Sequence, residues 1–308
     1  MPGTTTTTQM SQLTAREVDF VTRFNSNWDA LMAILGIANP IRKTPGTRLV
    51  SYKASMVDSA LQGGDSSVVA EGATIPFTQF KVEPVAYSDL KIDKHGKSVS
   101  IEAVAKYGAE VAVAKTDDAF LVELQNKIMN KFYTFLKTGT LVGVQKTWQR
   151  AMAIAKAGVL NKFASMHKDV TEVVAFVNVM DVYDYLGDTQ ISVQSNFGLQ
   201  YVKDFLGYST VFLLPDNVIP QKTVIALPVE NIDMYYIDPA DSDFAKLGLT
   251  YTTVGETNLV GFHAEGDYSR ASGDVYAIMG IELWAEYLDG ICIVTVGSTN
   301  TTPAVSGT

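Results

Sequence analysis

The three histidines are the residues of this chain best suited to acid–base chemistry, and none has a partner at the spacing of a known catalytic motif. His95 lies in a turn-like sequence and His167 in a polar connection. His263 is followed by the alternating polar residues Glu265, Asp267 and Ser269. A serine, a histidine and an acid therefore lie close together, but the Gly-x-Ser-x-Gly nucleophile elbow is absent. Alternating side chains of a strand face solvent together, so the sequence predicts no catalytic residue.

The single cysteine and the acidic clusters predict neither a redox centre nor a metal site. Cys292 lies in an apolar run, where a free thiol acts as a small hydrophobic side chain. Asp238, Asp241 and Asp243 carry oxygen ligands of the kind calcium prefers, but the twelve-residue loop with its glycine and final glutamate is absent. Glycine-rich phosphate loops and paired metal motifs are absent too. We therefore expect a solvated acidic turn, with no catalytic, cofactor-binding or metal residue.

The composition is that of a folded protein with one large domain or two. The chain has 308 residues, of which 47% are hydrophobic and 19% charged. No apolar run approaches the ~20 residues of a membrane helix, and the Thr-rich start does not resemble a signal peptide. We therefore expect no membrane association and synthesis in the cytoplasm. The net charge of −9 argues against binding of phosphate groups, although an acidic wall suits a container that must release nucleic acid.

The strongest structural signal is a period-two alternation that follows Glu71. The apolar members of this pattern are Phe80, Val82, Ala86, Leu90 and Ile92. The pattern predicts a half-buried strand of about fifteen residues, or roughly 50 Å, whereas a compact chain of this length has a radius of gyration of only ~19 Å. The strand should therefore leave the body as an arm whose apolar face needs a neighbouring subunit. Residues 48–53 supply the outgoing strand, residues 63–67 a Gly-rich tip and residues 93–97 a turn.

Helical patterns flank this arm on both sides. Thr14 and Glu17 have the spacing of a capping box, which begins an amphipathic helix that ends near Gly36. Thr116 can cap a second helix that ends near Lys137. Its apolar stripe consists of Leu121, Leu124, Ile128, Phe132 and Phe135. We expect the two phenylalanines to pack on the sheet that contains the last strands of the chain.

The second half of the chain alternates between the two kinds of secondary structure. The patterns predict helices near residues 148–155, at 179–186 and at 199–206, and strands at 172–177, 210–214 and 223–227. Residues 275–287 alternate as a strand, and Asp289-Gly290 is a hairpin signal before a return strand at 291–296. Residues 297–308 read as a polar, disordered tail. The order of elements predicts an α+β protein with an α/β subdomain.

This order resembles that of the major capsid proteins of tailed bacteriophages, the Hong Kong 97-type capsid fold. In that family an extended loop often ends in a Glu-Gly-x-x-Ile-Pro-like segment, which matches Glu71-Gly72-Ala73-Thr74-Ile75-Pro76, and precedes a long spine helix. The resemblance implies five parts. They are an N-terminal arm (1–46), an extended loop (47–97), a peripheral domain with the spine helix (98–140 and 259–298), an axial domain (141–258) and a C-terminal tail (299–308).

The resemblance also implies a function and partners. The chain would be a structural protein that forms pentamers and hexamers of an icosahedral shell in the virion, assembled in the host cytoplasm. The shell would enclose double-stranded DNA without reading its sequence. A separate scaffolding protein, a portal and decoration proteins are possible partners. Some capsids of the family join a loop lysine to a neighbouring asparagine, but Met56–Thr74 contains no lysine. The alternatives are an encapsulin-like compartment of the same fold and a soluble α/β enzyme that uses residues 141–258.

Overall fold

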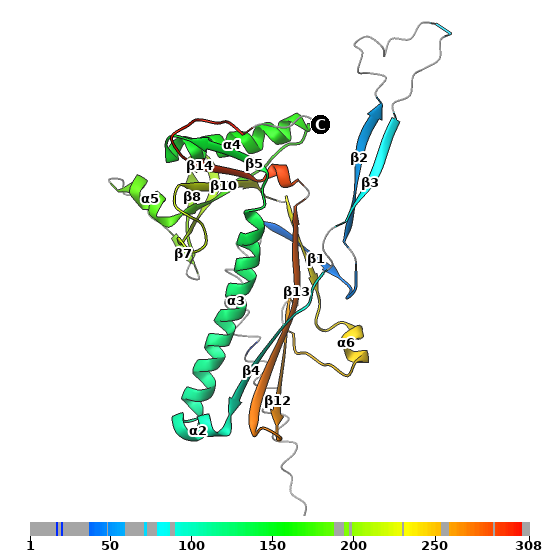
Figure 1. Cartoon of the computed structure of the whole chain (residues 1–308), viewed down its shortest axis with the longest axis vertical. Coiled ribbons are helices and arrows are strands. Elements are labelled where there is room, and N and C mark those ends of the chain that lie inside the picture. Colours follow the sequence, from blue (N-terminus) through cyan, green and yellow to red (C-terminus); the bar gives the residue numbers. More distant parts are fainter. Residues whose placement is uncertain are drawn as a thin grey trace, which may run out of the picture.

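The protein is an elongated α+β molecule with a projecting hairpin (Figure 1). The computed structural model describes residues 17, 20, 37–47, 49–58, 71–72, 79–86, 90–187, 194–196, 199–229, 231–253, 259–285 and 287–303. The expectations for Thr14 and for the loop tip at 63–67 lie outside these residues, as does most of the predicted N-terminal helix. None of the described helices is long and apolar enough to cross a membrane.

A sheet of five strands forms the lower part of the body. Its central strand is β13 (Ser272–Ala285), whose first half pairs antiparallel with both β12 (Val260–Asp267) and β4 (Asp93–Ser100). The second half of β13 pairs antiparallel with β11 (Ile232–Ile237), which pairs in parallel with β1 (Ala38–Lys43). The alternation predicted for residues 275–287 is therefore confirmed as one long strand.

A helical column lies along one face of this sheet (Figure 1). It begins with α2 (Ile101–Tyr107), passes through a π-helical turn at Glu110–Ala114 and continues as α3 (Lys115–Leu136). The predicted cap at Thr116 is wrong, because the helix is already under way there. The Thr116 hydroxyl instead donates to the carbonyl oxygens of Ala112, at 2.6 Å, and Val113, at 3.0 Å. A π-turn frees such carbonyl groups, and this side chain satisfies them.

A sheet of seven strands forms the upper part, with α4 (Trp148–Ser165) against it. In spatial order the strands are β5 (Leu141–Gln145), β14 (Cys292–Val296), β10 (Thr223–Pro228), β6 (Val173–Asn178), β9 (Tyr208–Leu214), β8 (Leu199–Phe205) and β7 (Gln194–Asn196). The helix α5 (Val179–Leu186) follows β6, and the short α6 (Ser242–Lys246) follows β11. The predicted helices near 148–155 and at 179–186 are confirmed, as are the three predicted strands.

Two hydrophobic clusters hold these layers together. The larger joins α3 to both sheets, because Leu124, Ile128 and Phe132 share it with Phe176 of β6 and Phe262 of β12. The Phe132 ring makes an edge contact with Phe176 at 5.7 Å between centroids. The last two strands of the chain lie in different sheets, and Phe132 packs at the joint between those sheets, with Phe135 on the same cluster. The smaller cluster lies between α4 and the upper sheet.

Three further local expectations are wrong. Residues 199–206 form β8 instead of a helix, and residues 93–97 form the start of β4 instead of a turn. The long alternating strand is two strands, β3 (Gln79–Ala86) and β4, and Leu90 before β4 is buried against Ile237 of the body. Burial of this leucine shows that the arm ends sooner than the alternation implied.

The predicted final hairpin is also wrong, as is the disorder predicted for residues 297–303, while residues 304–308 lie outside the described chain. Residues 288–290 form a 3₁₀ turn, and β14 enters the upper sheet between β5 and β10, while β13 stays in the lower one. The hairpin partner of β13 is β12, which precedes it. Beyond β14 the chain is tied to β5, since Val144 and Thr301 exchange backbone hydrogen bonds. The boundaries of the five parts named above stay predictions.

Candidate functional site

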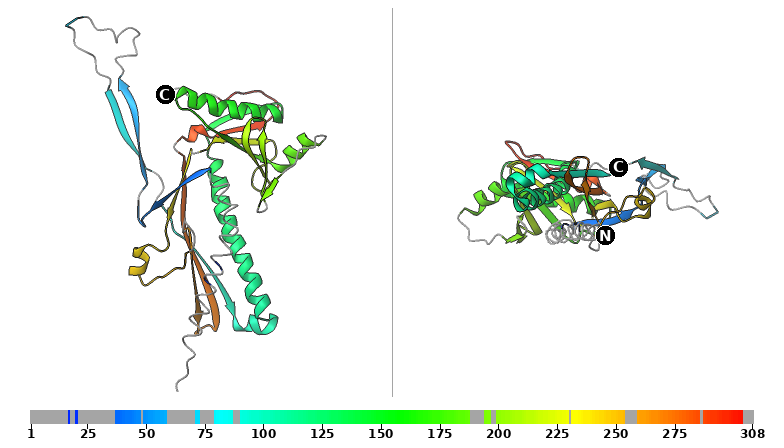
Figure 2. Two further views of the ribbon diagram at one scale, coloured as in Figure 1. Left: turned by 180° about the vertical axis from the view of Figure 1, so that it is seen from behind. Right: turned by 90° about the horizontal axis from the view of Figure 1, so that it is seen from below.

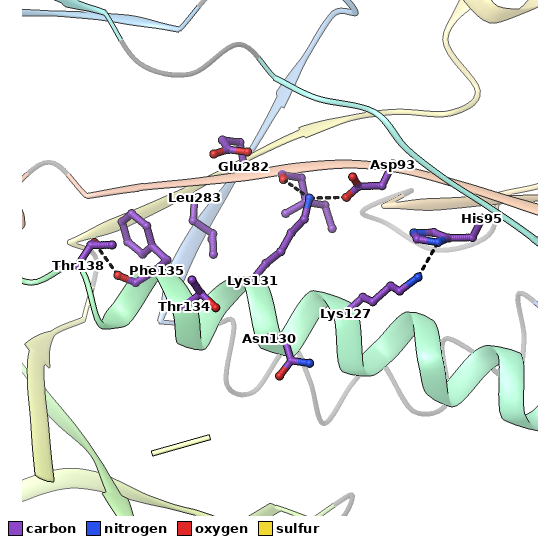
Figure 3. Close-up of a pocket in the computed structure, with 11 residues that line it drawn as sticks. Asp93, His95, Lys127, Asn130, Lys131, Thr134, Phe135, Thr138, Glu282 and Leu283 are labelled. Atoms are coloured by element: carbon purple, nitrogen blue, oxygen red, sulfur yellow. Dashed lines mark hydrogen bonds and ion pairs between the residues drawn. The ribbon is translucent and has the colours of Figure 1, made fainter. Parts of the chain in front are cut away.

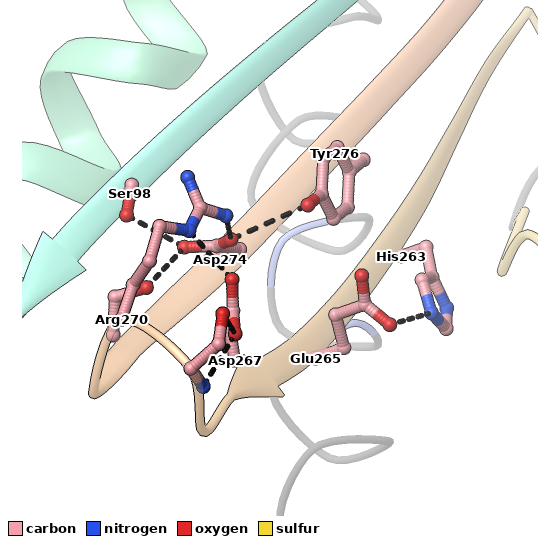
Figure 4. Close-up of polar contacts among 9 residues, drawn as sticks. Ser98, His263, Glu265, Asp267, Arg270, Asp274 and Tyr276 are labelled. Atoms are coloured by element: carbon pink, nitrogen blue, oxygen red, sulfur yellow. Dashed lines mark hydrogen bonds and ion pairs between the residues drawn. The ribbon is translucent and has the colours of Figure 1, made fainter.

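The described residues do not assemble the catalytic trio that the sequence allowed. His263 lies on β12 with its Nδ1 3.1 Å from the Glu17 carboxylate, and its Nε2 is 3.9 Å from Glu265. The Ser269 hydroxyl donates to Asp267 at 2.6 Å, so that serine is a turn residue rather than a partner of the histidine. Figure 4 shows the histidine and the turn apart on β12. The hydrogen bonds therefore fit a structural role for each of these residues.

The three aspartates considered as calcium ligands make hydrogen bonds and ion pairs with other residues of the chain. Asp238 is buried and pairs with Arg42 of β1 at 3.1 Å, and its carboxylate also accepts from the Ala240 amide. Asp241 caps α6, and Asp243 pairs with Lys246. These contacts join β1 to the loop after β11. Within the described part of the chain, no cluster of histidine, cysteine and acidic residues has the arrangement of a metal site.

Cys292 is inert in this environment. Its side chain is fully buried between α4 and the upper sheet. Burial raises the pKa of the thiol to about 12, so that almost none of the reactive thiolate exists near neutral pH. The cysteine is a packing residue, as the sequence predicted.

A network of hydrogen bonds around Asp274 fastens the lower end of the body (Figure 4). This buried carboxylate accepts from the hydroxyls of Ser98, at 2.6 Å, and Ser272, at 3.0 Å, and pairs with Arg270 at 2.6 Å. These bonds, the Ser98 bond foremost, lower the pKa of Asp274. The network joins β4, β13 and the turn after β12, so it holds three segments that are distant in sequence.

A second polar lock lies at the π-helical turn. Lys97 of β4 forms a nearly buried ion pair with Asp117 of α3 and donates to the carbonyl oxygen of Val113 at 3.3 Å. The lysine therefore satisfies a carbonyl that the turn frees, while the aspartate compensates its charge. Sequence reasoning missed this pair because it treated residues 93–97, which include Lys97, as a turn.

Glu17 docks the start of the chain on the outer edge of β12. Its carboxylate accepts from the Ala264 amide at 2.7 Å and from the Thr252 hydroxyl at 2.6 Å. Phe20 is fully buried and stacks on Phe262 with ring centroids 5.6 Å apart. The sequence assigned Glu17 to a capping box, whereas the structure uses it to satisfy an amide at a strand edge. The spacing of Glu17 and Phe20 on one helical face was the available signal.

The arm is the part of the molecule that receives least support from the rest of its own chain. The strands β2 (Val50–Asp58) and β3 pair only with each other in the described chain, and Figures 1 and 2 show this hairpin standing clear of the body. The Val82 side chain on it is 59% exposed. A two-stranded hairpin is marginally stable in water. A hairpin that projects without support from the body is suited to contact with another molecule that orders it.

Comparison with solved structures identifies the fold. The capsid protein of cyanophage P-SCSP1u matches with a TM-score of 0.57 and 8% identity, over 85% of this chain and 87% of that chain. The mature capsid of bacteriophage PhiM1 matches with a TM-score of 0.54 and 9% identity, over 86% of each chain. The capsid of cyanophage A-1(L) matches with a TM-score of 0.50 and 15% identity, over 85% of this chain and 92% of that chain.

These likenesses confirm the predicted α+β capsid fold of tailed bacteriophages. No protein-family model matches the chain. No curated protein matches it either. The fold is thus recognisable from the arrangement of helices and strands at sequence identities of 8% to 15%.

Proposed function

We propose that the chain is the major capsid subunit of a tailed bacteriophage. Copies would form pentamers and hexamers that close an icosahedral shell around double-stranded DNA. The observation that carries the proposal is the projecting β2–β3 hairpin on a body with the phage capsid fold. A side chain such as Val82, 59% exposed on that hairpin, gains burial only when another subunit covers it.

The polar residues support a structural rather than an enzymatic role. His263, the acidic turn at Asp238–Asp243 and Cys292 each have a structural contact or a buried position, as described above. The absence of lysine in Met56–Thr74 favours a shell held by non-covalent contacts. A scaffolding protein, a portal and decoration proteins would be separate chains.

Electron microscopy of the purified protein tests the proposal. We expect closed shells built of pentameric and hexameric rings, or such rings before closure. A protein that stays monomeric over a range of concentration and ionic strength would refute it. The contents of particles from the native source separate the two shell functions. Nuclease-resistant double-stranded DNA supports the capsid, whereas packed enzyme supports an encapsulin-like compartment.

A further inference from the structure

The open edge of the lower sheet is blocked by a side chain of α3 (Figure 3). Residues 280–285 of β13 pair with β11 alone among the described strands, and residues 281–283 line a groove of about 660 Å³ along α3. Lys131 of α3 reaches across this groove and donates to the carbonyl oxygen of Ile281 at 3.3 Å, while an ion pair with Asp93 compensates its charge. An unpaired strand edge can accept a strand of another chain, and a lysine placed on the edge opposes that pairing.

The edge of the upper sheet is covered by the end of the chain instead. β14 pairs with one side of β5, and the residues that follow β14 turn back along the other side (Figure 1). We call residues 298–303 the C-terminal strap. The Val144 amide donates to the carbonyl oxygen of Thr301 at 3.0 Å, and the Thr301 amide donates to that of Val144 at 2.7 Å. β5 is therefore enclosed between two consecutive segments of the chain.

Side chains fix the register of the C-terminal strap on β5. The Gln145 side chain, which is buried, donates to the carbonyl oxygen of Thr301 at 3.1 Å. The Lys146 amide donates to the side-chain oxygen of Asn300 at 3.1 Å. Both bonds are possible only in the register set by the backbone pair, so the strap has one defined position on the edge.

The C-terminal strap ends in a buried proline that fits a slot between β5 and α4. Pro303 lies against Gly143 of β5 and Gly158 of α4, and a methyl group at Gly143 would come within 2.9 Å of the proline ring. A glycine at position 143 therefore admits the strap, whereas any larger residue would push it away. In the register of the backbone pair, Pro303 stands opposite Val142. Because proline has no amide to donate, strand pairing ends there.

We propose that the C-terminal strap protects the edge of the upper sheet and prevents β5 from pairing with an extended segment of a second copy of this chain. The strap satisfies the outward amides of Val144 and Lys146, and its final proline offers no amide from which pairing could continue. Without the strap β5 is a suitable template, because buried and more exposed residues alternate along it and Val142 is 61% exposed. The inference concerns the single subunit, so it holds whether or not the subunit forms shells.

Amide hydrogen exchange on the unassembled full-length protein tests whether the C-terminal strap covers the edge. Gly143→Ala places a methyl group against the strap, and Thr301→Pro removes the amide that donates to Val144. Each variant should speed exchange of the Val144 amide by about tenfold or more. The Gln145 amide faces β14 and should stay protected, which shows that the sheet is intact. Gly266→Ala is the control, because nothing lies within 4 Å of the methyl group that it adds.

Association of the same variants tests whether the strap prevents pairing between copies. At concentrations where the wild-type protein is unassembled, Gly143→Ala and Thr301→Pro should sediment as aggregates that are irregular in electron micrographs, and Gly266→Ala should not. An excess of a peptide of residues 297–308 should reduce the aggregation of the Thr301→Pro protein. The same peptide carrying Thr301→Pro should not reduce it.

Two results would overturn the proposal. Unchanged exchange of the Val144 amide in both variants would show that the C-terminal strap does not cover the edge. Variants that expose this amide yet sediment like the wild-type protein, or equal rescue by the two peptides, would show that the strap does not prevent pairing. Continued protection of Gln145 in the aggregating variants excludes unfolding of the upper sheet as the cause.

Discussion

Replacement of Phe132 by alanine tests the joint on which the two sheets meet. The side chain is fully buried and contacts the rings of Phe176, at 5.7 Å, and Tyr133, at 5.9 Å. Truncation of a buried phenylalanine costs about 3–5 kcal/mol. A loss of about 4 kcal/mol changes the unfolding equilibrium nearly a thousandfold. It is also a large share of the ~5–15 kcal/mol by which proteins of this kind are stable.

Urea unfolding of unassembled subunits, followed by circular dichroism, measures this loss. At a slope of about 3 kcal/mol per molar urea, the midpoint of Phe132→Ala should fall by about 1 M or more. Val122→Ala is the matched control on the same helix, because Val122 is 51% exposed, and it should change stability by no more than about 0.5 kcal/mol. A Phe132→Ala protein within about 1 kcal/mol of wild type would refute the assignment of this residue to the joint.

Four further outcomes can be tested. Deletion of Val57–Ala70 should leave a subunit that melts normally but forms few shells, and normal shell yield would contradict the role of the arm. Shells should melt above unassembled subunits because association stabilises the folded chain. Boiling them in detergent should return one band at 33.5 kDa, whereas a ladder resistant to detergent and reductant would reveal covalent links. The lowered pKa of Asp274 gives stability that is complete above the ordinary carboxyl pKa of 3.8 and is lost as the pH falls through the lower folded value. Asp274→Asn should therefore be less stable near pH 7 and lose less stability on acidification, and an unchanged acid profile would contradict the network.

The spacing of the hydrophobic residues predicted most of the regular helices and strands correctly. It failed where a local backbone distortion gives the buried residues of a strand the spacing of a helix. Residues 199–206 are the clearest case. Val202 and Phe205 are both buried and three residues apart, which is the spacing of a helix. The structure produces that spacing within a strand, because Asp204 between them adopts a φ of 52°. Leu206 and Gly207, with φ of 49° and 81°, then turn the chain into β9.

The site was harder to predict than the fold, because its contacts join residues that are far apart in sequence. Glu17 meets Ala264, and Ser98 meets Asp274, across separations that no short motif records. Asp289-Gly290 gave a valid local hairpin signal, yet burial of Cys292 and Val294 in the upper sheet overrode it.

The polar locks of the body and the projecting arm divide the work of the molecule between folding and association. The lower end is held within the chain, since the Asp274 carboxylate and the Lys97–Asp117 pair are both buried or nearly so. The arm has no such lock in the described chain, and its two strands pair only with each other. A long hairpin in that state contributes little to the stability of its own subunit and a great deal to a contact that orders it. Assembly should therefore order and stabilise the arm far more than the body, so amide hydrogen exchange should slow on assembly chiefly in β2 and β3. Equal slowing in β13 and α3 would argue against this division.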